Sequence, residues 1–322
     1  YISNMDVYSI KNKKLNSVEI IPFKKEKDIQ DLVEKNSMTL FGVDFVSSEF
    51  TIGEFRIDSL CFDHDNNSFV VIEYKKGSSY SVIDQGYSYL SKMLNNKDSF
   101  ILEYCKKKNV SVDVEVDWSE SRIIFVSPSF NSYQKNSVNF QDIPFELWEI
   151  KQFSNGSVVL NQHISRSNQS IKKVTKGKES VIQKVNKEVR VLNEEDTLNN
   201  KKVNENIREL YYQLKERISE WEDFNTNPKS NYISFKRNKK VFVFLNFRKN
   251  YMRVHILSCL KTKWDGTREK VTPSSKFLLD DPKKMFKIWE NDYKVLYSYD
   301  LKDDKNLDYF ILMLKQKFDD VG

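Results

Sequence analysis

The sequence is poor in cysteine, glycine and proline, and each shortage excludes a class of protein. Its 322 residues include only 3 cysteines, 8 glycines and 6 prolines. Low glycine and proline exclude collagen-like and low-complexity chains. The cysteines are far apart and form no CxxC pair, which argues against a disulfide framework or a zinc site and favours a reducing compartment. We therefore expect a cytoplasmic protein.

Long apolar runs and several common catalytic motifs are also missing. No run approaches the roughly 20 apolar residues that a membrane helix needs, and the N-terminus lacks the apolar core of a signal peptide. The sequence contains no glycine-rich phosphate loop and no spacing that indicates a Ser/His or Cys/His nucleophile. Any chemistry must therefore come from other side chains, above all from carboxylates and lysines.

What the chain does contain is enough apolar material for two cores and an uneven distribution of charge. Hydrophobic residues make up 39% of the sequence, and a domain usually takes roughly 100–200 residues. Residues 1–162 hold 18 basic and 23 acidic residues, residues 163–190 hold 8 and 2, and residues 191–322 hold 26 and 21. The basic excess lies wholly in the middle and C-terminal parts, where it would attract a polyanionic partner.

Apolar periodicity divides the chain into three parts. In residues 1–162 it predicts helices at 24–40 and 81–107 and strands at 55–62, 69–72, 110–116, 122–126 and 145–153. Residues 163–202 form a basic linker, Ser/Asn/Lys-rich at first and then with the spacing of a short surface helix. In residues 203–322 it predicts helices at 203–221 and 307–318 and strands at 232–236, 241–247, 252–257 and 294–299. The last part is therefore an α+β domain.

The segment most informative for chemistry is the predicted hairpin that carries Asp58 and then Glu73-Tyr74-Lys75. Glu73 and Lys75 are two residues apart, so both side chains leave the same face of one strand. Asp58 lies on the adjoining strand and can approach that face. Two carboxylates with the backbone carbonyl of Tyr74 would supply the oxygen ligands that Mg²⁺ prefers, beside a lysine that can polarise water.

An acid-x-Lys triplet alone is a weak signal, because others occur in this chain, among them Glu149-Ile150-Lys151. The context of the first one is what sets it apart: it ends a continuous apolar strand, and an Asp precedes it by one hairpin. Two flanking residues fit the same site. Glu34 is either part of the site or an exposed helix acid, and Gln85 is either near the end of the strand or a helix-surface amide.

The order of these elements resembles the PD-(D/E)XK nuclease superfamily. A helix Glu, Arg-Ile-Asp, Val-Ile-Glu-x-Lys and Gln-x-x-x-Tyr follow one another as in its NucS-like endonuclease branch, over about residues 20–155. Residues 203–320 resemble the small uncharacterised domain often fused to that nuclease domain. The resemblance implies an α/β fold with a restriction-endonuclease-like core, in which helices flank a mixed sheet, plus a smaller α+β C-terminal domain. One departure is Phe55, where the family usually has Gly before Arg-Ile-Asp.

The resemblance also implies roles for single residues. Asp58 and Glu73 would bind Mg²⁺ or Mn²⁺, and Lys75 would position or polarise the attacking water. Glu34 would assist the metal site, and Gln85 would contact the phosphate or Lys75. These roles imply a metal-dependent endodeoxyribonuclease that hydrolyses phosphodiester bonds with metal-activated water.

A basic stretch in the C-terminal domain is the second candidate interface. Seven basic residues of this stretch are candidates for nucleic-acid binding: Lys236, Arg237, Lys239, Lys240, Arg248, Lys249 and Arg253. Arg56, in the N-terminal part, is a further candidate. Phe242 and Phe244 are interleaved with these seven and are either stacking residues or, more simply, core.

Two rival functions remain open from the sequence. The nuclease fold could bind nucleic acid without cutting it, or the chain could be a protein-interaction module in a defence or regulatory assembly. Whether the DNA is duplex, single-stranded or branched, and whether the chain forms a homodimer, are left open as well.

Overall fold

The computed structural model describes residues 6–75, 81–110, 114–140, 142–165, 167, 171, 181–238, 240–260, 272, 276–291 and 294–321. The chain forms two compact units, Tyr1–Val191 and Leu192–Gly322. Within the described residues, no helix is both long and apolar enough to cross a membrane.

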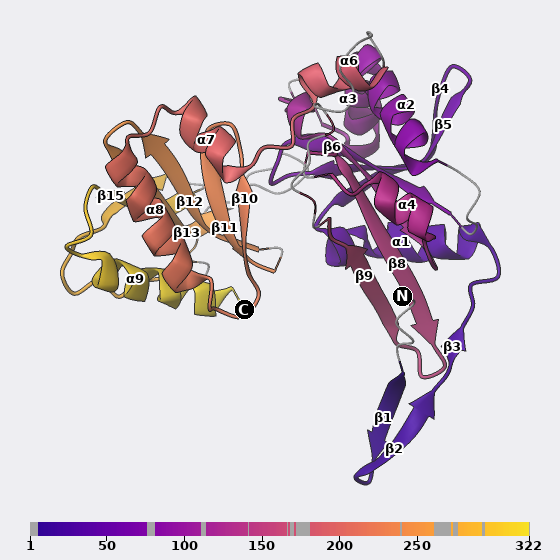
Figure 1. Cartoon of the computed structure of the whole chain (residues 1–322), viewed down its shortest axis with the longest axis horizontal. Coiled ribbons are helices and arrows are strands. Elements are labelled where there is room, and N and C mark those ends of the chain that lie inside the picture. Colours follow the sequence, from indigo (N-terminus) through magenta and orange to yellow (C-terminus); the bar gives the residue numbers. More distant parts are fainter. Residues whose placement is uncertain are drawn as a thin grey trace. The chain divides into compact units, whose positions relative to one another are not determined.

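Unit 1 is a mixed sheet between helices (Figure 1). Its strands are β1 (Val7–Lys11), β2 (Lys14–Val18), β3 (Ile20–Ile21), β4 (Asp44–Ile52), β5 (Phe55–Asp63), β6 (Ser68–Tyr74), β7 (Arg122–Ser127), β8 (Phe145–Phe153) and β9 (Val158–His163). Its helices are α1 (Glu26–Phe41), α2 (Val82–Asn95), α3 (Lys97–Lys108), the 3-10 turn η1 (Trp118–Glu120), α4 (Ser132–Ser137) and α6 (Val181–Glu188).

The main sheet has the order β3-β8-β7-β6-β5-β4, with β9 also paired to β8. β6, β7 and β8 run parallel to one another, whereas β4, β5 and β6 form an antiparallel meander. Successive side chains of β6 point to opposite faces of the sheet. Val70 and Ile72 join Ile29 and Val33 of α1 in one core, while Val71 joins α2 and α3 in the other. Glu73 therefore projects on the same side of the sheet as α2.

The middle of the chain belongs partly to each unit. Ile171, Val185 and Val189 are buried in the core beneath α2, and the Tyr87 hydroxyl of α2 donates to Asn186 of α6 over 3.2 Å. Helix α7 (Glu194–Asn200) instead joins the core of unit 2. The predicted bounds 1–162, 163–202 and 203–322 stay a prediction, which the fragments discussed below would test.

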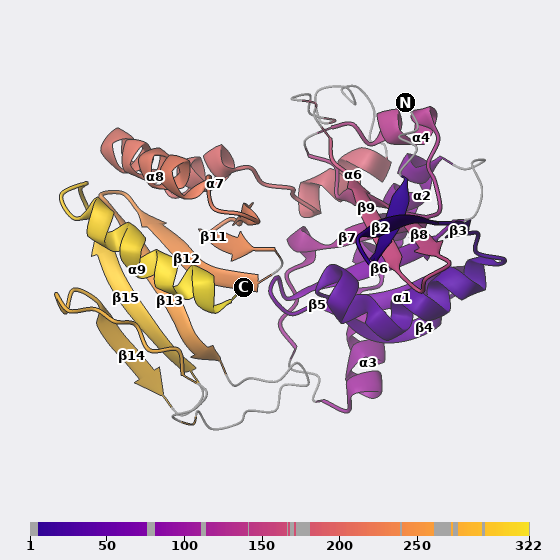
Figure 2. The ribbon, with the colours of Figure 1, turned by 90° about the horizontal axis from the view of Figure 1, so that it is seen from below.

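Unit 2 is an antiparallel sheet with helices on one face (Figure 2). Its strands are β10 (Phe224–Pro228), β11 (Tyr232–Arg237), β12 (Lys240–Arg248), β13 (Tyr251–Leu260), β14 (Lys287–Asn291) and β15 (Lys294–Leu301), in the order β10-β11-β12-β13-β15-β14. Helices α8 (Glu205–Ile218) and α9 (Leu307–Asp320) bury one face together with Val243, Leu245, Phe247 and Ile256. The predicted fold class, a mixed sheet flanked by helices followed by a smaller α+β domain, is confirmed.

Two predicted elements differ from the structure, and several strands were not predicted. The long helix predicted at 81–107 is two helices, α2 and α3, because Asn96 leaves helical geometry with a φ of −132°. A strand predicted at 110–116 is absent from its described residues, 110 and 114–116, and residues 111–113 lie outside the described part. Strand β4 was not predicted at all, because its register shifts between Phe45 and Ser47 and this shift breaks the alternation of apolar residues.

Candidate active site

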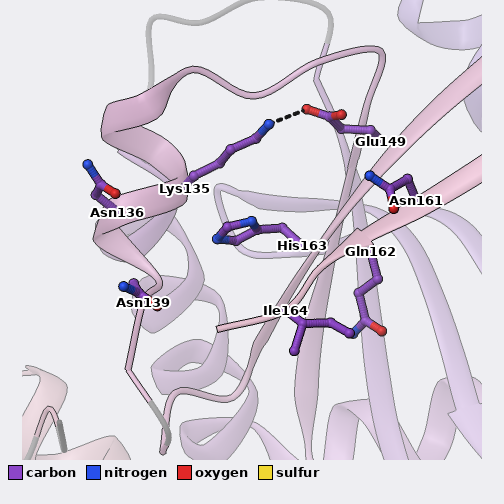
Figure 3. Close-up of a pocket in the computed structure, with 8 residues that line it drawn as sticks. All are labelled: Lys135, Asn136, Asn139, Glu149, Asn161, Gln162, His163 and Ile164. Atoms are coloured by element: carbon purple, nitrogen blue, oxygen red, sulfur yellow. Dashed lines mark ion pairs between the residues drawn. The ribbon is translucent and has the colours of Figure 1, made fainter. Parts of the chain in front are cut away.

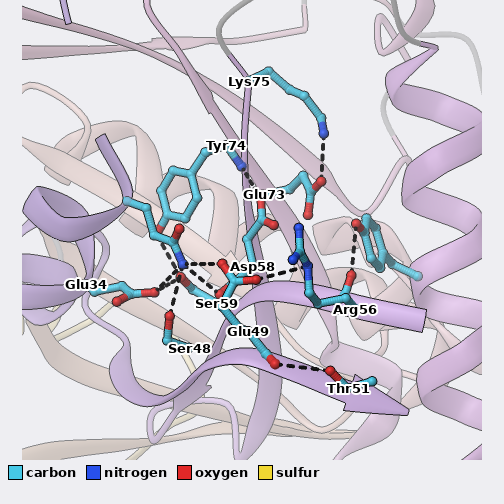
Figure 4. Close-up of polar contacts among 12 residues, drawn as sticks. Glu34, Ser48, Glu49, Thr51, Arg56, Asp58, Ser59, Glu73, Tyr74 and Lys75 are labelled. Carbon is cyan, nitrogen blue, oxygen red and sulfur yellow. Dashed lines mark hydrogen bonds and ion pairs between the residues drawn. The ribbon is translucent and has the colours of Figure 1, made fainter. Parts of the chain in front are cut away.

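The candidate site lies where the β5–β6 hairpin stops being a regular ladder (Figure 4). The last paired residues are Ser59 and Ile72, so Asp58 and Glu73 are the first positions beyond the ladder. The Tyr74 backbone N–H donates to Oδ2 of Asp58 over 3.1 Å instead of to a strand carbonyl. The side chain of Asp58 thereby takes the place of a ladder hydrogen bond and is held beside β6.

Glu73 is buried, with 3% of its surface exposed, and its two oxygens have different surroundings. Oε1 accepts from Nζ of Lys75 and from Nε2 of Gln85, each over 2.7 Å. Oε2 is buried and has no hydrogen-bond donor among the residues that the structure describes. A buried carboxylate oxygen without a donor is costly, and a bound cation would remove that cost.

Asp58 and Glu73 also repel each other electrostatically. Burial, and after it the negative charge of Glu73, raises the pKa of Asp58 to about 7, against the opposing effects of the Tyr74 N–H and of Lys75. The Lys75 side chain is only 15% exposed and forms an ion pair with Glu73. One lysine therefore faces one buried and one partly buried acid, and the cluster has an electrostatic deficit that a divalent cation would fill.

Gln85 reaches the site from the first turn of α2. The hydroxyl of Ser81 accepts from the Asp84 N–H and so caps this helix beside β6. Nε2 of Gln85 also contacts the hydroxyl of Tyr89 over 3.2 Å, one helical turn further on. Gln85 therefore contacts Glu73, whereas the resemblance had implied the phosphate or Lys75 as its partner; no described contact joins it to Lys75.

Glu34 lies one contact further from the two acids, on α1. Its Oε1 accepts from the Ser59 hydroxyl over 2.6 Å and from Nε2 of Gln30 over 2.8 Å. Ser59 in turn shares a 3.0 Å hydrogen bond with the hydroxyl of Tyr74. Glu34 is thus linked to Asp58 and Glu73 through the two residues that follow them in sequence, and it can orient the hairpin more directly than it can bind a shared ion.

Gln30 and Glu49 belong to this cluster, and the sequence reasoning missed both. Gln30 is buried, and Nε2 lies 3.0 Å from the Asp58 carbonyl and 3.2 Å from Oε1 of Glu49. Arg56, with a side chain 67% exposed, pairs with Oε2 of Glu49 over 2.9 Å. Gln30 is four residues before Glu34, on the same helix face beside buried Ile29. That spacing is the signal in the sequence that could have revealed it.

The donors present fit a hard divalent ion with few protein ligands. In the described part of the chain, no group of three or more His, Cys, Asp and Glu side chains could hold a metal. Asp58 and Glu73 would therefore have to act with the Tyr74 carbonyl and water. Mg²⁺ commonly keeps several waters and takes one or two carboxylates, so this donor set suits it. The orphaned oxygen of Glu73 is the structural observation in favour of a cation there.

A second polar cavity, of about 410 Å³, lies on the same unit (Figure 3). It is lined by Lys135, Asn136, Asn139, Glu149, Asn161, Gln162, His163 and Ile164. Lys135 of α4 pairs with Glu149 of β8 over 2.9 Å. Burial, and after it the charge of Lys135, lowers the pKa of His163. Glu149 thus pairs with a lysine of another element, Lys135 of α4, whereas Glu73 pairs with Lys75 of its own triplet.

The basic residues of the C-terminal domain do not form one surface. Arg237 lies over the ring of Phe318 on α9, with 4.6 Å between its Cζ and the ring centroid. Arg253 forms a two-point ion pair with Asp300. Lys236 is half-buried, Lys240, Arg248 and Lys249 are exposed, and Lys239 lies outside the described residues. The two aromatic candidates also separate, because Phe242 is core and Phe244 is half-buried on the face away from the helices.

Comparison with known proteins places the whole chain in a family. It is 37% identical over 326 residues to an uncharacterized protein of Haemophilus influenzae, and the match covers 98% of this chain and all of that protein. The chain belongs to that protein's family. Within it, residues 194–280 match a model described as a domain of unknown function, DUF5655.

Among solved structures the likenesses are partial. A complex of EndoMS with double-stranded DNA matches 41% of this chain and 47% of its own, at 20% identity and a TM-score of 0.23. A repair endonuclease from Pyrococcus abyssi matches 41% and 59%, at 19% identity and a TM-score of 0.21. SfsA of Pyrococcus furiosus with Ca²⁺ matches 47% and 77%, at 10% identity and a TM-score of 0.23. Values this low carry no weight for function, which has to come from the site itself.

Proposed function

We propose that this family member is a metal-dependent endodeoxyribonuclease of the PD-(D/E)XK type. One observation carries the proposal: Glu73 is buried beside Asp58, with Lys75 and Gln85 on one oxygen and no donor from the described residues on the other. A chain selected only for stability gains little from such an arrangement, since a buried acid with an empty lone pair is costly. An acid with a strongly raised pKa, as Asp58 has, beside a second acid and a lysine is typical of active sites.

Asp58, Glu73 and the carbonyl of Tyr74 are the groups that would hold Mg²⁺ or Mn²⁺. Bound there, the ion supplies positive charge for the scissile phosphate and acidifies water at neutral pH. Gln85 fixes the carboxylate of Glu73 through Oε1 and leaves Oε2 without a donor among the described residues. The Tyr74 N–H does the same for Asp58 through its Oδ2. Both acids are therefore oriented before any substrate arrives.

Lys75 supplies the remaining chemistry. Its ammonium group lies 2.7 Å from Glu73 and remains partly exposed, so it can hold a water or a phosphate oxygen at the edge of the site. A cation in that position favours the ionised form of an attacking water and the extra negative charge that develops on the phosphate. Glu34 and Gln30 act at a distance, by holding Ser59 and the Asp58 carbonyl.

The experiment is a cleavage assay on purified protein with Mg²⁺ or Mn²⁺. Closed circular plasmid, single-stranded DNA, branched DNA and RNA of similar length are incubated with the protein and resolved on gels. Nicking or linearisation of the closed circle identifies an endonuclease. We expect Glu73→Ala and Lys75→Ala to reduce cleavage by about 100-fold or more, since each removes a group that contacts the reacting atoms.

The matched control is Lys151→Ala, which alters the acid-x-Lys triplet on β8 in the same way and should leave cleavage unchanged. Cleavage that persists in both site variants would show that the activity resides elsewhere or in a contaminant. If the intact protein binds these substrates but cuts none of them, the rival function of binding without cleavage replaces this one. The observation that favours this rival is the small number of metal ligands that the described residues supply.

A further inference from the structure

The sheet of unit 2 presents its second face without a helix in the part that the structure describes (Figure 2). Side chains of each strand alternate between the two faces. On β13, Met252, Val254 and Ile256 enter the core beneath the helices, so Arg253 and His255 point the other way. On β15, Asp300 is paired with Arg253 and Ser298 with His255, so these two residues lie on the same open face.

This open face is hollowed. A groove of about 920 Å³ runs over β13, β15 and the edge strand β14. It is lined by Arg253, His255, Met285, Lys287, Ile288, Trp289, Leu296, Ser298, Tyr299, Asp300, Lys302, Asp303, Lys305 and Asn306. A smaller cavity of about 310 Å³ shares His255 and Leu296 with it and extends to Tyr232 and Phe244. The two form one adjoining surface that crosses from β14 to β11.

Most charged side chains that line the groove are basic, and most of these are exposed to solvent. Arg253 is held by Asp300, with Nε 2.6 Å from Oδ1 and Nη2 2.9 Å from Oδ2. That pair neutralises the more central of the two acids that line the groove. Lys287, Lys302 and Lys305 are exposed and form no ion pair with the described residues. An anionic ligand would therefore find three exposed lysines around the Arg253–Asp300 pair.

Flat rings lie beside these charges. Trp289 is 50% exposed on the edge strand, which is unusual for so large an apolar side chain. Tyr232 and Phe244 are half-buried in the smaller cavity and meet edge to face, with 5.5 Å between their ring centroids. Rings and lysines on one sheet face suit a single strand of nucleic acid. Its bases are free to stack on the rings, and each nucleotide carries a phosphate that a lysine can bind. A duplex hides the faces of its bases.

We propose that this open face, from Trp289 and Lys287 across Arg253 to Phe244, binds single-stranded nucleic acid. It would hold phosphates on Lys287 and Lys302 and stack bases on Trp289 and Phe244. The proposal concerns binding by unit 2 and does not rest on cleavage by unit 1, because either activity could exist without the other. It also differs from the basic set predicted from sequence, of which only Arg253 lines the groove.

The test is fluorescence anisotropy of the full chain in EDTA, so that cleavage cannot interfere. The probes are a labelled 15-nucleotide thymidine strand, the same backbone without bases, and a labelled polyglutamate of similar charge. We expect the thymidine strand to bind most tightly. Trp289→Ala should weaken it by about 5- to 100-fold, as loss of one stacking platform does, whereas Trp289→Phe should retain most of the affinity.

Salt dependence separates the lysines from the ring. Lys287→Gln and Lys302→Gln should each reduce the slope of log affinity against log salt by about 0.7, the value for one phosphate contact with a single strand. The matched control is Lys315→Gln on α9, the helix that covers the other face, which should leave the slope unchanged. A strand carrying 5-bromouracil should cross-link on irradiation to a peptide containing Trp289 or Phe244.

Three results would overturn the proposal. The first is equal affinity for the strand with and without bases, which would leave only a charged surface. Tighter binding of polyglutamate would identify an acidic protein segment as the ligand. Unchanged affinity in Trp289→Ala, with cross-links only to unit 1, would place the strand elsewhere on the chain, whatever the outcome of the cleavage assay.

Discussion

Gln30 shows how the residues around the two acids depend on one another. Its side-chain nitrogen lies within 3.2 Å of four oxygens, on Glu34, Ser48, Glu49 and the Asp58 backbone. An amide nitrogen carries only two hydrogens, so it cannot satisfy all four fully at once. Ser59 donates a further hydrogen bond to Glu34, and Arg56 forms an ion pair with Glu49. The position of the Asp58 backbone is therefore coupled to both helix α1 and strand β4.

The raised pKa of Asp58 predicts a specific dependence of stability on pH in metal-free protein. The folded pKa is about 7, whereas the ordinary value is 3.8. Between these values the folded state binds the extra proton, so this group lowers the free energy of unfolding as pH rises from about 4 to 7 and has no further effect above. Asp58→Asn removes the dependence. Urea unfolding in EDTA from pH 4 to pH 9 measures it as the difference between the two proteins.

That difference isolates Asp58 from Glu149, Asp281 and Asp300, whose lowered pKa values act in the opposite direction and are common to both proteins. Mg²⁺ should reduce the dependence and raise the midpoint of thermal unfolding in the wild-type protein, because it favours the ionised acid. The same ion should leave Asp58→Asn unchanged. Parallel stability curves for the two proteins would contradict the assignment of the buried acid.

Among elements, α2 is placed by a contact that only glycine allows. A Cβ on Gly86 would lie 2.6 Å from two ring atoms of Phe145 on β8. Gly86→Ala should therefore destabilise unit 1 by about 1–3 kcal/mol through overpacking, partly offset by the better helix propensity of alanine. Because Gln85 precedes this glycine, the shift should also reduce cleavage. Thermal unfolding and the plasmid assay measure the two effects.

Two variants control for other causes. Ser88→Ala changes an exposed position of the same helix and should affect neither measurement. Gly86→Ala combined with Phe145→Leu makes room for the added methyl and should recover part of the stability. If Gly86→Ala is as stable and active as the wild type, the packing of α2 on β8 does not determine where Gln85 lies.

Sequence patterns predict the elements best where they act locally. Alternation and an Asp/Asn-rich turn predict the β5–β6 hairpin, and with it the proximity of Asp58 to Glu73 and Lys75. Register is a different matter. The partnership of Arg253 with Asp300 follows from pairing of β13 with β15, 47 residues apart, and no local pattern indicates it. Gln30 likewise meets Ser48 and Asp58 only because α1 packs on that sheet.

For the whole molecule, the extent of unit 1 is testable with two fragments. Residues 1–191 keep Val185 of α6 and Val189 just after it, both buried against the core, whereas residues 1–162 lack them and also Ile171. Loss of three buried apolar side chains costs several kcal/mol at about 1.5–3 kcal/mol each. We expect 1–191 to unfold cooperatively and at a higher temperature than 1–162, followed by circular dichroism. Equal midpoints would favour the shorter boundary predicted from the sequence.

Charge is divided between the parts of the chain in a way that suits two tasks. The first 162 residues carry five more acids than bases, and the basic excess is shared between residues 163–190 of unit 1, with 8 bases and 2 acids, and unit 2, with 26 bases and 21 acids. Acids are needed where a cation is to be held, and they repel a phosphate backbone until that cation is present. Under the two proposals, capture of the nucleic acid falls to unit 2 and hydrolysis falls to unit 1.

The β1–β2 hairpin has a consequence for handling the protein. Asn12 and Lys13 both have positive φ, 52° and 61°, which makes the tight turn whose twist suits two antiparallel strands. Tyr8, Ile10 and Leu15 are more than half exposed, and a lone two-stranded ribbon is marginally stable in water. Its backbone amides should therefore exchange with deuterium far sooner than those of β6. Among the described residues, the peptide bonds after the lysines at its tip should be the first that trypsin cuts in the folded protein.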